Sequence, residues 1–260
     1  MTFATLVRRN VLDPVRSRSI WVLLGLFALV FGLMGYLLGG NVGGGFAWSV
    51  AQIMAGLGPL AALGFSYDSI AGPRESGSLR VMLSYPYTRR DLVLGTLTGR
   101  VLVLGLTVVV GLVAGALSTL VFGGTLTADL LPIALLSLLL TTTTVAIAVG
   151  ISASVSTSAR AAITAFGAYL LFSGFWSLVP SGIRYLLNGL SFPQGPPPEW
   201  TFVWNQLNPL NAFRTATAAI VDTPISSAFY HGAAFALAVL VGWFVLSTVV
   251  GVLRFERTDL

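Results

Sequence analysis

Long stretches without a charged residue constrain this chain more than any other feature of its sequence. No Arg, Asp or Glu occurs in residues 19–67, 101–128 or 130–159. Two further stretches of this kind run over residues 161–183 and 223–253. A helix needs about 20 apolar residues to cross the hydrocarbon core of a membrane. Each stretch is therefore long enough for one crossing, and the first is long enough for two.

The overall composition also indicates that the chain lies in a membrane. Hydrophobic residues make up 55% of the chain, charged residues only 9%, and the mean hydropathy is +0.88. Soluble domains carry about 25% charged residues, so most of this chain must be surrounded by lipid. This excludes a soluble enzyme and a disordered regulator, and the lack of cysteine excludes a secreted disulfide scaffold.

The positive charges exclude two further classes of protein. All 14 cationic side chains are arginine, and the sequence contains no lysine. A Walker A loop and a Schiff-base enzyme both require a lysine, so the chain is predicted to be neither. The arginines flank the apolar stretches, where signals for membrane orientation lie. We therefore interpret the pI near 10.1 as a membrane feature and expect no nucleic-acid partner.

The pattern predicts an all-α integral membrane protein that forms a single domain over residues 1–260. The glycine-rich turn at residues 39–45 divides the first stretch into two helices. The six expected spans are 20–38, 46–66, 93–122, 130–152, 161–181 and 230–253. The first span is too long for a signal peptide and is expected to be retained. With both termini in the cytoplasm, only Arg184 and Arg214 face outward, as the preference for positive charges inside requires.

The middle of the predicted spans lacks ionisable residues. Such residues usually mark proton or ion paths. His231, Met34 and Met54 are a poor set of metal ligands, so neither a metal site nor a catalytic residue is expected. The threonine run 141–144 either forms hydrogen bonds within and between helices or lines a polar path. The chain is thus either a passive channel or carrier, or a permease driven by another protein.

The N-terminal residues 1–18 are amphipathic. On a helical projection Phe3, Leu6 and Val7 share one face, and Arg8 and Arg9 share the other. This pattern is typical of a helix that lies in the membrane interface. Contact with the lipid bilayer is therefore expected to extend to this segment.

The loop over residues 68–91 is longer than a connection between two spans requires. Gly72 and Pro73 are expected to end the preceding helix. A short amphipathic helix is then predicted from three apolar residues at helical spacing, Leu79, Met82 and Leu83. Thr88 and Asp91 resemble a capping box at the start of the next helix. A rigid helix at this place could dock on a soluble partner.

Residues 74–91 also resemble the signature of ABC-2 type permeases. The match begins with Arg74-Glu75-Ser76-Gly77-Ser78-Leu79 and continues past Pro86 to Gly95, and it departs at Thr96, where the family often has lysine. The resemblance implies the membrane subunit of an ATP-binding-cassette exporter in a prokaryotic cell membrane. A second permease subunit would pair with it, as a homodimer or a heterodimer. A separate cytoplasmic ATPase subunit would bind ATP, so this chain would need no cofactor.

The resemblance also implies roles for the residues of this loop, which would enter a cleft of the ATPase. Leu79, Met82 and Leu83 would form the buried anchor, and Glu75 and Arg80 would form charged contacts. The N-terminal helix would flank the same joint. The complete set of expected coupling residues is Arg74, Glu75, Ser76, Gly77, Leu79, Arg80, Met82 and Leu83.

The outer segment, residues 183–229, precedes the last span. Asn208 and Pro209 are predicted to cap and start a helix that continues to about Val221. Together with Phe213 and Arg214 they resemble the family's Asn-Pro segment. This helix is expected to be re-entrant or interfacial, and it acts either as an outer gate or as a surface cover. The segment could also meet an extracytoplasmic partner, because its layout resembles the permeases of nitrous-oxide-reductase maturation.

Overall fold

The computed structural model of the chain describes residues 7–8, 10–12, 18–39, 45–79, 88–192, 194–221 and 228–257. Every regular element among these residues is a helix, as the sequence predicted. The longer helices are α2 (Ser19–Gly39), α3 (Phe46–Ser66), α6 (Arg89–Val121), α7 (Leu130–Ser154), α8 (Ser158–Leu170) and α12 (Ala233–Glu256). The shorter ones are α4 (Ala71–Glu75), the π-helical η1 (Leu171–Phe175), α9 (Leu178–Leu187), α10 (Glu199–Gln206), α11 (Pro209–Ile220) and the 3-10 turn η2 (Phe229–His231).

Five helical segments of the described chain are long and apolar enough to cross a membrane. They are Ser19–Leu38, Phe46–Glu75, Arg89–Val121, Leu130–Ser154 and Ala233–Glu256. A bent pair of helices, Ser158–Phe175 and Leu178–Leu187, raises the number to six if the pair is one span. The protein is therefore a multi-pass helical bundle with five or six candidate spans.

The segment expected to be a span over residues 161–181 is bent. α8 and η1 form one helix as far as Phe175, and the axis then turns by 68° into α9. The π-helical geometry of η1 accompanies a hydrogen bond from outside the helix, in which Asn208 Nδ2 donates to the carbonyl oxygen of Phe172 at 2.7 Å. A side chain that bonds into a helix ladder is a recognised cause of a sharp kink. The local sequence carries no signal for this distant donor.

Gly72 and Pro73 do not end the preceding helix, contrary to the sequence prediction. The break lies earlier, in the turn over residues 67–70, and both residues belong to α4. Pro73 occupies the first turn of α4, where a backbone N–H would have no partner within the helix. The proline is therefore tolerated inside α4, at a place where the sequence pattern predicted a helix break.

Helices α2 and α6 pack backbone against backbone through small residues. A Cβ atom on Gly35 would collide with the carbonyl oxygen of Gly115 and would lie 2.9 Å from the backbone nitrogen of Thr119. The hydroxyl of Ser118 donates to the carbonyl oxygen of Gly32 at 2.7 Å. Small residues and interhelical hydroxyl bonds are typical of helix pairs in membranes.

Helix α7 lies at the centre of the bundle, where it contacts α3, α6, α8, α11 and α12. Three residues of its threonine run, Thr141, Thr143 and Thr144, are buried. Thr141 and Thr144 donate to carbonyl oxygens one turn back in the same helix, and Thr143 Oγ1 donates to Leu240 O of α12 at 3.2 Å. These contacts favour the hydrogen-bonding interpretation of the run over a polar path.

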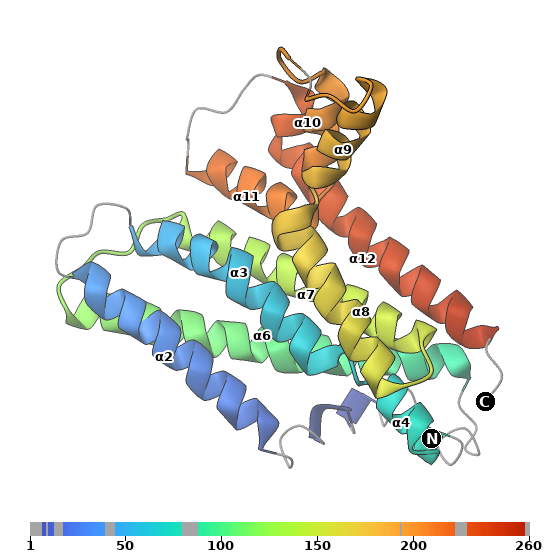
Figure 1. Cartoon of the computed structure of the whole chain (residues 1–260). Coiled ribbons are helices and arrows are strands. Elements are labelled where there is room, and N and C mark those ends of the chain that lie inside the picture. Colours follow the sequence, from blue (N-terminus) through green and yellow to red (C-terminus); the bar gives the residue numbers. More distant parts are fainter. Residues whose placement is uncertain are drawn as a thin grey trace.

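Different short helices lie at the two ends of the bundle (Figure 1). α9 and α10 gather at one end, whereas α4 lies at the other. The end at α4 carries Arg74, Arg89, Arg90, Arg160 and Arg254, and we call it the arginine end. α7 and α12 pack closely near this end, because a Cβ atom on Gly251 would lie 2.9 Å from the Cα atom of Gly150.

Candidate functional site

The candidate site lies at the arginine end, where α4 meets the junction between α7 and α8. The backbone N–H groups of Ile70 and Ala71 both donate to Ser152 Oγ at 3.0 Å. Ser152 is fully buried in α7. Since the first N–H groups of a helix have no partner within that helix, this hydroxyl fixes the start of α4 on the end of α7.

Arg74 binds the C-terminal end of α7. Its Nη1 donates to the carbonyl oxygen of Val155 at 2.6 Å, and its Nη2 donates to that of Ala153 at 3.3 Å. The last carbonyl groups of a helix lack partners within the helix, and a cation near them is also favoured by the helix dipole. The half-buried guanidinium of Arg74 therefore completes the end of α7.

Glu75, the next residue, binds the N-terminal end of α8. Its Oε2 accepts a hydrogen bond of 2.8 Å from the backbone N–H of Ser158, the first residue of α8. A carboxylate is favoured at this end of a helix because the dipole is positive there. The adjacent residues Arg74 and Glu75 thus hold the two helix ends on either side of one short turn.

The C-terminal end of α12 joins the same cluster. The ring of Phe255, which is fully buried, lies 5.1 Å from the guanidinium carbon of Arg74 and 5.9 Å from that of Arg89. Arg89 Nη1 also donates to the carbonyl oxygens of Phe255 and Glu256 at 3.0 and 3.2 Å. Arg90 forms an ion pair with Glu256 at 2.5 Å. The start of α6, α4 and the end of α12 are therefore bound together.

The capping box predicted at the start of α6 is present. Thr88 Oγ1 accepts from the backbone N–H of Asp91, and Asp91 Oδ2 accepts from the backbone N–H of Thr88 at 3.0 Å. The two bonds satisfy two helix N–H groups reciprocally. Helix α6 therefore starts at Arg89, four residues before the expected span.

Leu79 is placed differently from the expected partner contact. It is only 1% exposed and packs inside this chain with Ile70, Leu92 and Phe255. It is therefore not free to enter a partner's cleft. The expected coupling residues Arg80, Met82 and Leu83 lie outside the described residues.

The two serines of the expected coupling segment form a tight turn. Ser76 Oγ and Ser78 Oγ are 3.0 Å apart, and each donates to the carbonyl oxygen of Pro73 at 3.3 Å. Gly77 has a φ of +73°, a backbone conformation that favours glycine. Beside this turn lies an open polar hollow of about 500 Å³, which Asp68, Glu75 and Ser158 help to line.

The N-terminal segment is described only in part. Val7 and Arg8 are helical, with Arg8 exposed, whereas Phe3, Leu6 and Arg9 lie outside the described residues. A Cβ atom on Gly99 of α6 would collide with Asn10. The described part of the N-terminal segment therefore packs on α6.

At the opposite end, Asn208 caps α11 as predicted. Its Oδ1 accepts from the backbone N–H of Leu210 at 2.8 Å, and Pro209 is the first residue of the helix. Asn208, Pro209 and Phe213 are buried, whereas Arg214 is exposed. Three of the four residues expected to form an outer gate are therefore part of the protein interior.

Sequence reasoning did not detect the tryptophan cluster that fixes this end. Trp176 Nε1 donates to Trp204 O at 2.8 Å, Trp204 Nε1 donates to Trp176 O at 3.2 Å, and the two rings stack at 5.1 Å. Trp243 Nε1 donates to Leu207 O at 2.8 Å. An indole N–H needs a partner when it is buried, but the sequence does not show which carbonyl group supplies it.

Ser152, Phe255 and Ser158 were also missed at the arginine end. Each lies more than 75 positions from the Arg74–Glu75 pair along the chain. The only available signal was that Ser152 and Ser158 belong to the polar end of the α7 stretch. Among the described residues, no group of three or more His, Cys, Asp or Glu side chains could hold a metal ion.

The fold and this site define a multi-pass membrane protein whose helix ends are joined at one side of the bundle. Comparison with known proteins agrees with this class. The model of the ABC-2 family transporter proteins matches residues 4–260. The "Probable ABC transporter permease protein NosY" of Pseudomonas aeruginosa is 31% identical over 263 residues, which cover 90% of this chain and 95% of that protein. The protein of the same name from Stutzerimonas stutzeri is 32% identical over 120 residues, 44% of each chain.

The chain belongs to the ABC-2 family and is the permease subunit of an ABC-2 type transporter. This confirms the family that residues 74–91 indicated. It also sets aside the passive channel or secondary carrier. In this family the permease is a non-catalytic membrane subunit, and membership implies an ATPase partner.

Proposed function

We propose that this permease drives export with a separate cytoplasmic ATPase subunit that docks at the arginine end. Both termini would then lie in the cytoplasm of a prokaryotic cell. The distribution of arginine supports this orientation, because only Arg184 and Arg214 fall on the opposite side. The bacterial origin of the relatives supports the prokaryotic membrane.

The observation that carries the proposal is the double attachment of α4. Arg74 holds the end of α7, and Glu75 holds the start of α8. A force applied to α4 would act on both helices through these bonds, and on α12 through Phe255. Closure of the ATPase on ATP could therefore tilt several spans together.

The apolar partner-facing contacts would fall on residues other than Leu79. We assign the apolar anchor to Met82 and Leu83, because Leu79 is buried within this chain. Glu75 is exposed beside the polar hollow, where a basic or hydrogen-bonding side chain of the ATPase could bind. Arg80 would add a charged contact on the same segment.

Flanking elements complete the proposed transporter. The N-terminal helix with Val7 and Arg8 would lie in the cytoplasmic interface beside α6, which the contact between Asn10 and Gly99 supports. A second permease subunit would complete the path. The α11 helix would close the outer side, because its buried Asn208 and Phe213 anchor it.

The subgroup is also a proposal. The two relatives named NosY, together with the resemblance in the layout of the outer segment, support a place for this chain among such permeases. An extracytoplasmic partner would then bind near residues 183–229.

The docking proposal is tested by a mild-detergent pull-down of the tagged chain from its native host. Wild type is compared with Leu83→Asp and with the matched control Leu190→Asp, which lies in an exposed turn at the opposite end. We expect a soluble P-loop ATPase to bind wild type and Leu190→Asp but not Leu83→Asp. Failure to recover an ATPase in several detergents, or equal binding to all three chains, would overturn the docking site.

A further inference from the structure

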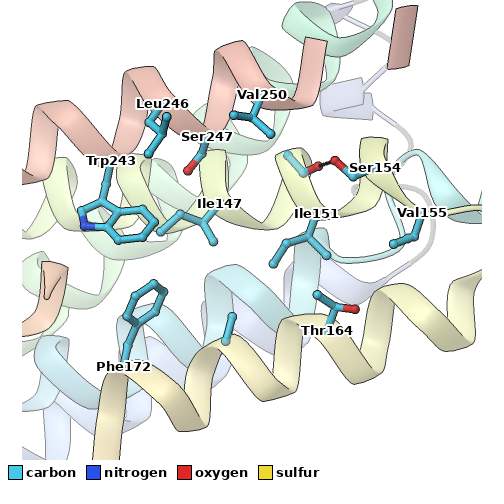
Figure 2. A pocket seen from close by; sticks show the side chains of 12 residues that line it. Ile147, Ile151, Ser154, Val155, Thr164, Phe172, Trp243, Leu246, Ser247 and Val250 are labelled. Atoms are coloured by element: carbon cyan, nitrogen blue, oxygen red, sulfur yellow. Dashed lines mark hydrogen bonds between the residues drawn. The ribbon is translucent and has the colours of Figure 1, made fainter. Parts of the chain in front are cut away.

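A groove separates α8 from α12, with α7 as its floor (Figure 2). It has a volume of about 370 Å³. Phe172 and Trp243 point toward each other across one end, with ring centroids 5.2 Å apart in an edge-on arrangement. Thr164 and Val155 line the other end, close to the arginine end of the bundle.

The groove surface is almost entirely apolar. Ile147, Ile151, Leu246 and Val250 line its length. The hydroxyl of Ser154, one of the few polar groups there, donates to the carbonyl oxygen of Gly150 at 2.7 Å. A surface of this kind is poor at binding water and suits a hydrocarbon chain.

The length of the groove matches one leaflet of a bilayer. A rise of about 1.5 Å per residue gives about 12 Å between Thr164 and Phe172. The hydrocarbon core of a bilayer is about 30 Å thick, so each leaflet contributes about 15 Å. The closed end at Phe172 and Trp243 would thus lie near the middle of the membrane, and the other end near the headgroups.

Two arginines continue the helix faces that line the groove. Arg160 precedes Thr164 by four residues on α8, and Arg254 follows Val250 by four residues on α12. Residues four apart lie above one another on a helix face. Both arginines are exposed, and both stand one helical turn beyond the groove on its headgroup side.

Two nearby carboxylates in the part of the chain that the structure describes have their own hydrogen-bond partners. Glu75 accepts from the backbone N–H of Ser158, and Glu256 pairs with Arg90. Two guanidinium groups, those of Arg160 and Arg254, therefore lie at the mouth of the groove. Guanidinium groups bind phosphate through paired N–H donors, so the mouth complements a phosphodiester.

We propose that this groove is a binding site for an anionic glycerophospholipid. One acyl chain lies between α8 and α12, and the phosphate lies at Arg160 and Arg254. This site is separate from the proposed ATPase contact and does not depend on it. A second copy of the permease is a less suitable occupant, because two guanidinium groups beside an apolar groove suit an anionic group attached to an apolar chain.

The test uses the purified full-length permease and counts bound lipids by native mass spectrometry. The probes are phosphatidylglycerol, zwitterionic phosphatidylcholine with the same acyl chains, and soluble glycerol phosphate. We expect wild type to retain phosphatidylglycerol with about tenfold higher apparent affinity than phosphatidylcholine, and glycerol phosphate not to compete.

Two kinds of variant separate the headgroup from the chain. Replacing both arginines, Arg160→Ala with Arg254→Ala, is expected to remove the preference for phosphatidylglycerol, whereas Arg184→Ala at the opposite end is expected to keep it. Thr164→Trp fills the groove and is expected to reduce retention of both lipids about tenfold. The matched control is Ile163→Trp, at the position directly before Thr164 on α8. Ile163 is 74% exposed and lies outside the groove, so this variant is expected to bind like wild type.

Three results would overturn the proposal. The first is an unchanged preference for phosphatidylglycerol in the double arginine variant. The second is competition by glycerol phosphate, which would indicate a phosphate site without an acyl chain. The third is a change of oligomeric state in Thr164→Trp with lipid retention unchanged, which would indicate that a second copy covers the groove. Thermal melting of each variant checks that it is folded. Because Arg160 and Arg254 are both exposed, we expect their replacement to leave the fold intact.

Discussion

The carboxylate of Glu75 accepts a hydrogen bond of 2.8 Å from the backbone N–H of Ser158, the first residue of α8. This bond connects the segment proposed to meet the ATPase with α8, whose apolar stretch bends by 68° into α9. Because Arg74 binds the end of α7 on the other side of the same turn, the turn over residues 155–158 is held from both ends. Movement of α4 and movement of α8 are therefore mechanically related.

Replacing Glu75 with alanine is expected to uncouple the permease from ATP hydrolysis. The start of α8 loses its link to α4, whereas Glu75→Gln retains an oxygen that can accept the same hydrogen bond. In vesicles that contain the permease with its ATPase, we expect the permease-dependent part of ATP hydrolysis to fall about tenfold in Glu75→Ala and less in Glu75→Gln. A tenfold change in rate corresponds to about 1.4 kcal/mol of activation free energy.

The control for this experiment is Glu199→Ala, which removes a carboxylate from the first turn of α10 at the opposite end. It is expected to behave like wild type. The prediction fails if Glu75→Ala couples normally, or if it does not insert into the membrane.

Gly251→Ala is expected to separate α12 from α7. The added Cβ atom would lie 2.9 Å from the Cα atom of Gly150, a backbone atom that cannot move aside alone. Overpacking costs about 1–3 kcal/mol, which corresponds to a fall in Tm of roughly 3–10 °C. The matched change on the same helix is Gly242→Ala, where a Cβ atom meets nothing within 4 Å. Thermal melting in detergent should show a decrease for Gly251→Ala and none for Gly242→Ala; equal Tm values would contradict the close approach.

Asn208→Asp is expected to destabilise the bend between η1 and α9. Aspartate can still cap α11, but it cannot donate to the carbonyl oxygen of Phe172, which Asn208 does at 2.7 Å in a buried site. An unsatisfied buried polar group costs about 1–3 kcal/mol. The fall in Tm should exceed that of Asn211→Asp, in which a half-buried amide loses a bond of 2.9 Å to Asn205 O. A larger effect at Asn211 would show that the Asn208 bond does not hold the bend.

The threonines of α7 provide a test against a polar path. Thr141→Val and Thr144→Val remove hydroxyl groups that are buried and bonded to carbonyl oxygens of their own helix. Because valine preserves the shape of threonine, we expect each variant to retain permease-dependent ATP hydrolysis within about twofold of wild type, a change of less than about 1 kcal/mol. A loss of tenfold or more in either variant would show that these hydroxyls contribute to a transport path.

Local patterns in the sequence were sufficient for features that depend on neighbouring residues. The capping box of Thr88 with Asp91 and the cap of Asn208 with Pro209 are both present. Each rests on bonds between residues at most three positions apart, so chain connectivity alone brings the groups together. The signature at residues 74–91 likewise identified the family.

Features that depend on residues far away in the sequence could not be predicted from local sequence patterns. The spacing of Leu79 fitted an anchor for a cleft of the ATPase, yet this side chain is buried against Ile70 and Leu92 of its own chain. Gly72 and Pro73 suggested a helix break, yet they lie within α4. In both cases the outcome depends on how α4 packs against other helices, which hydrophobic periodicity does not specify.

The sequence by itself determined that the chain is embedded in a membrane, because its charge-free stretches are too long and too apolar to be exposed to water. It also determined the family through one motif. The tertiary structure decided which helix ends Arg74 and Glu75 hold, where the apolar stretch of α8 bends, and which faces of α8 and α12 enclose a groove. These features depend on contacts between residues 36 to 166 positions apart. Composition and spacing determine whether a segment is surrounded by lipid or by water, and they determine its local conformation. Only the packing of the helices determines which groups each distant polar side chain contacts.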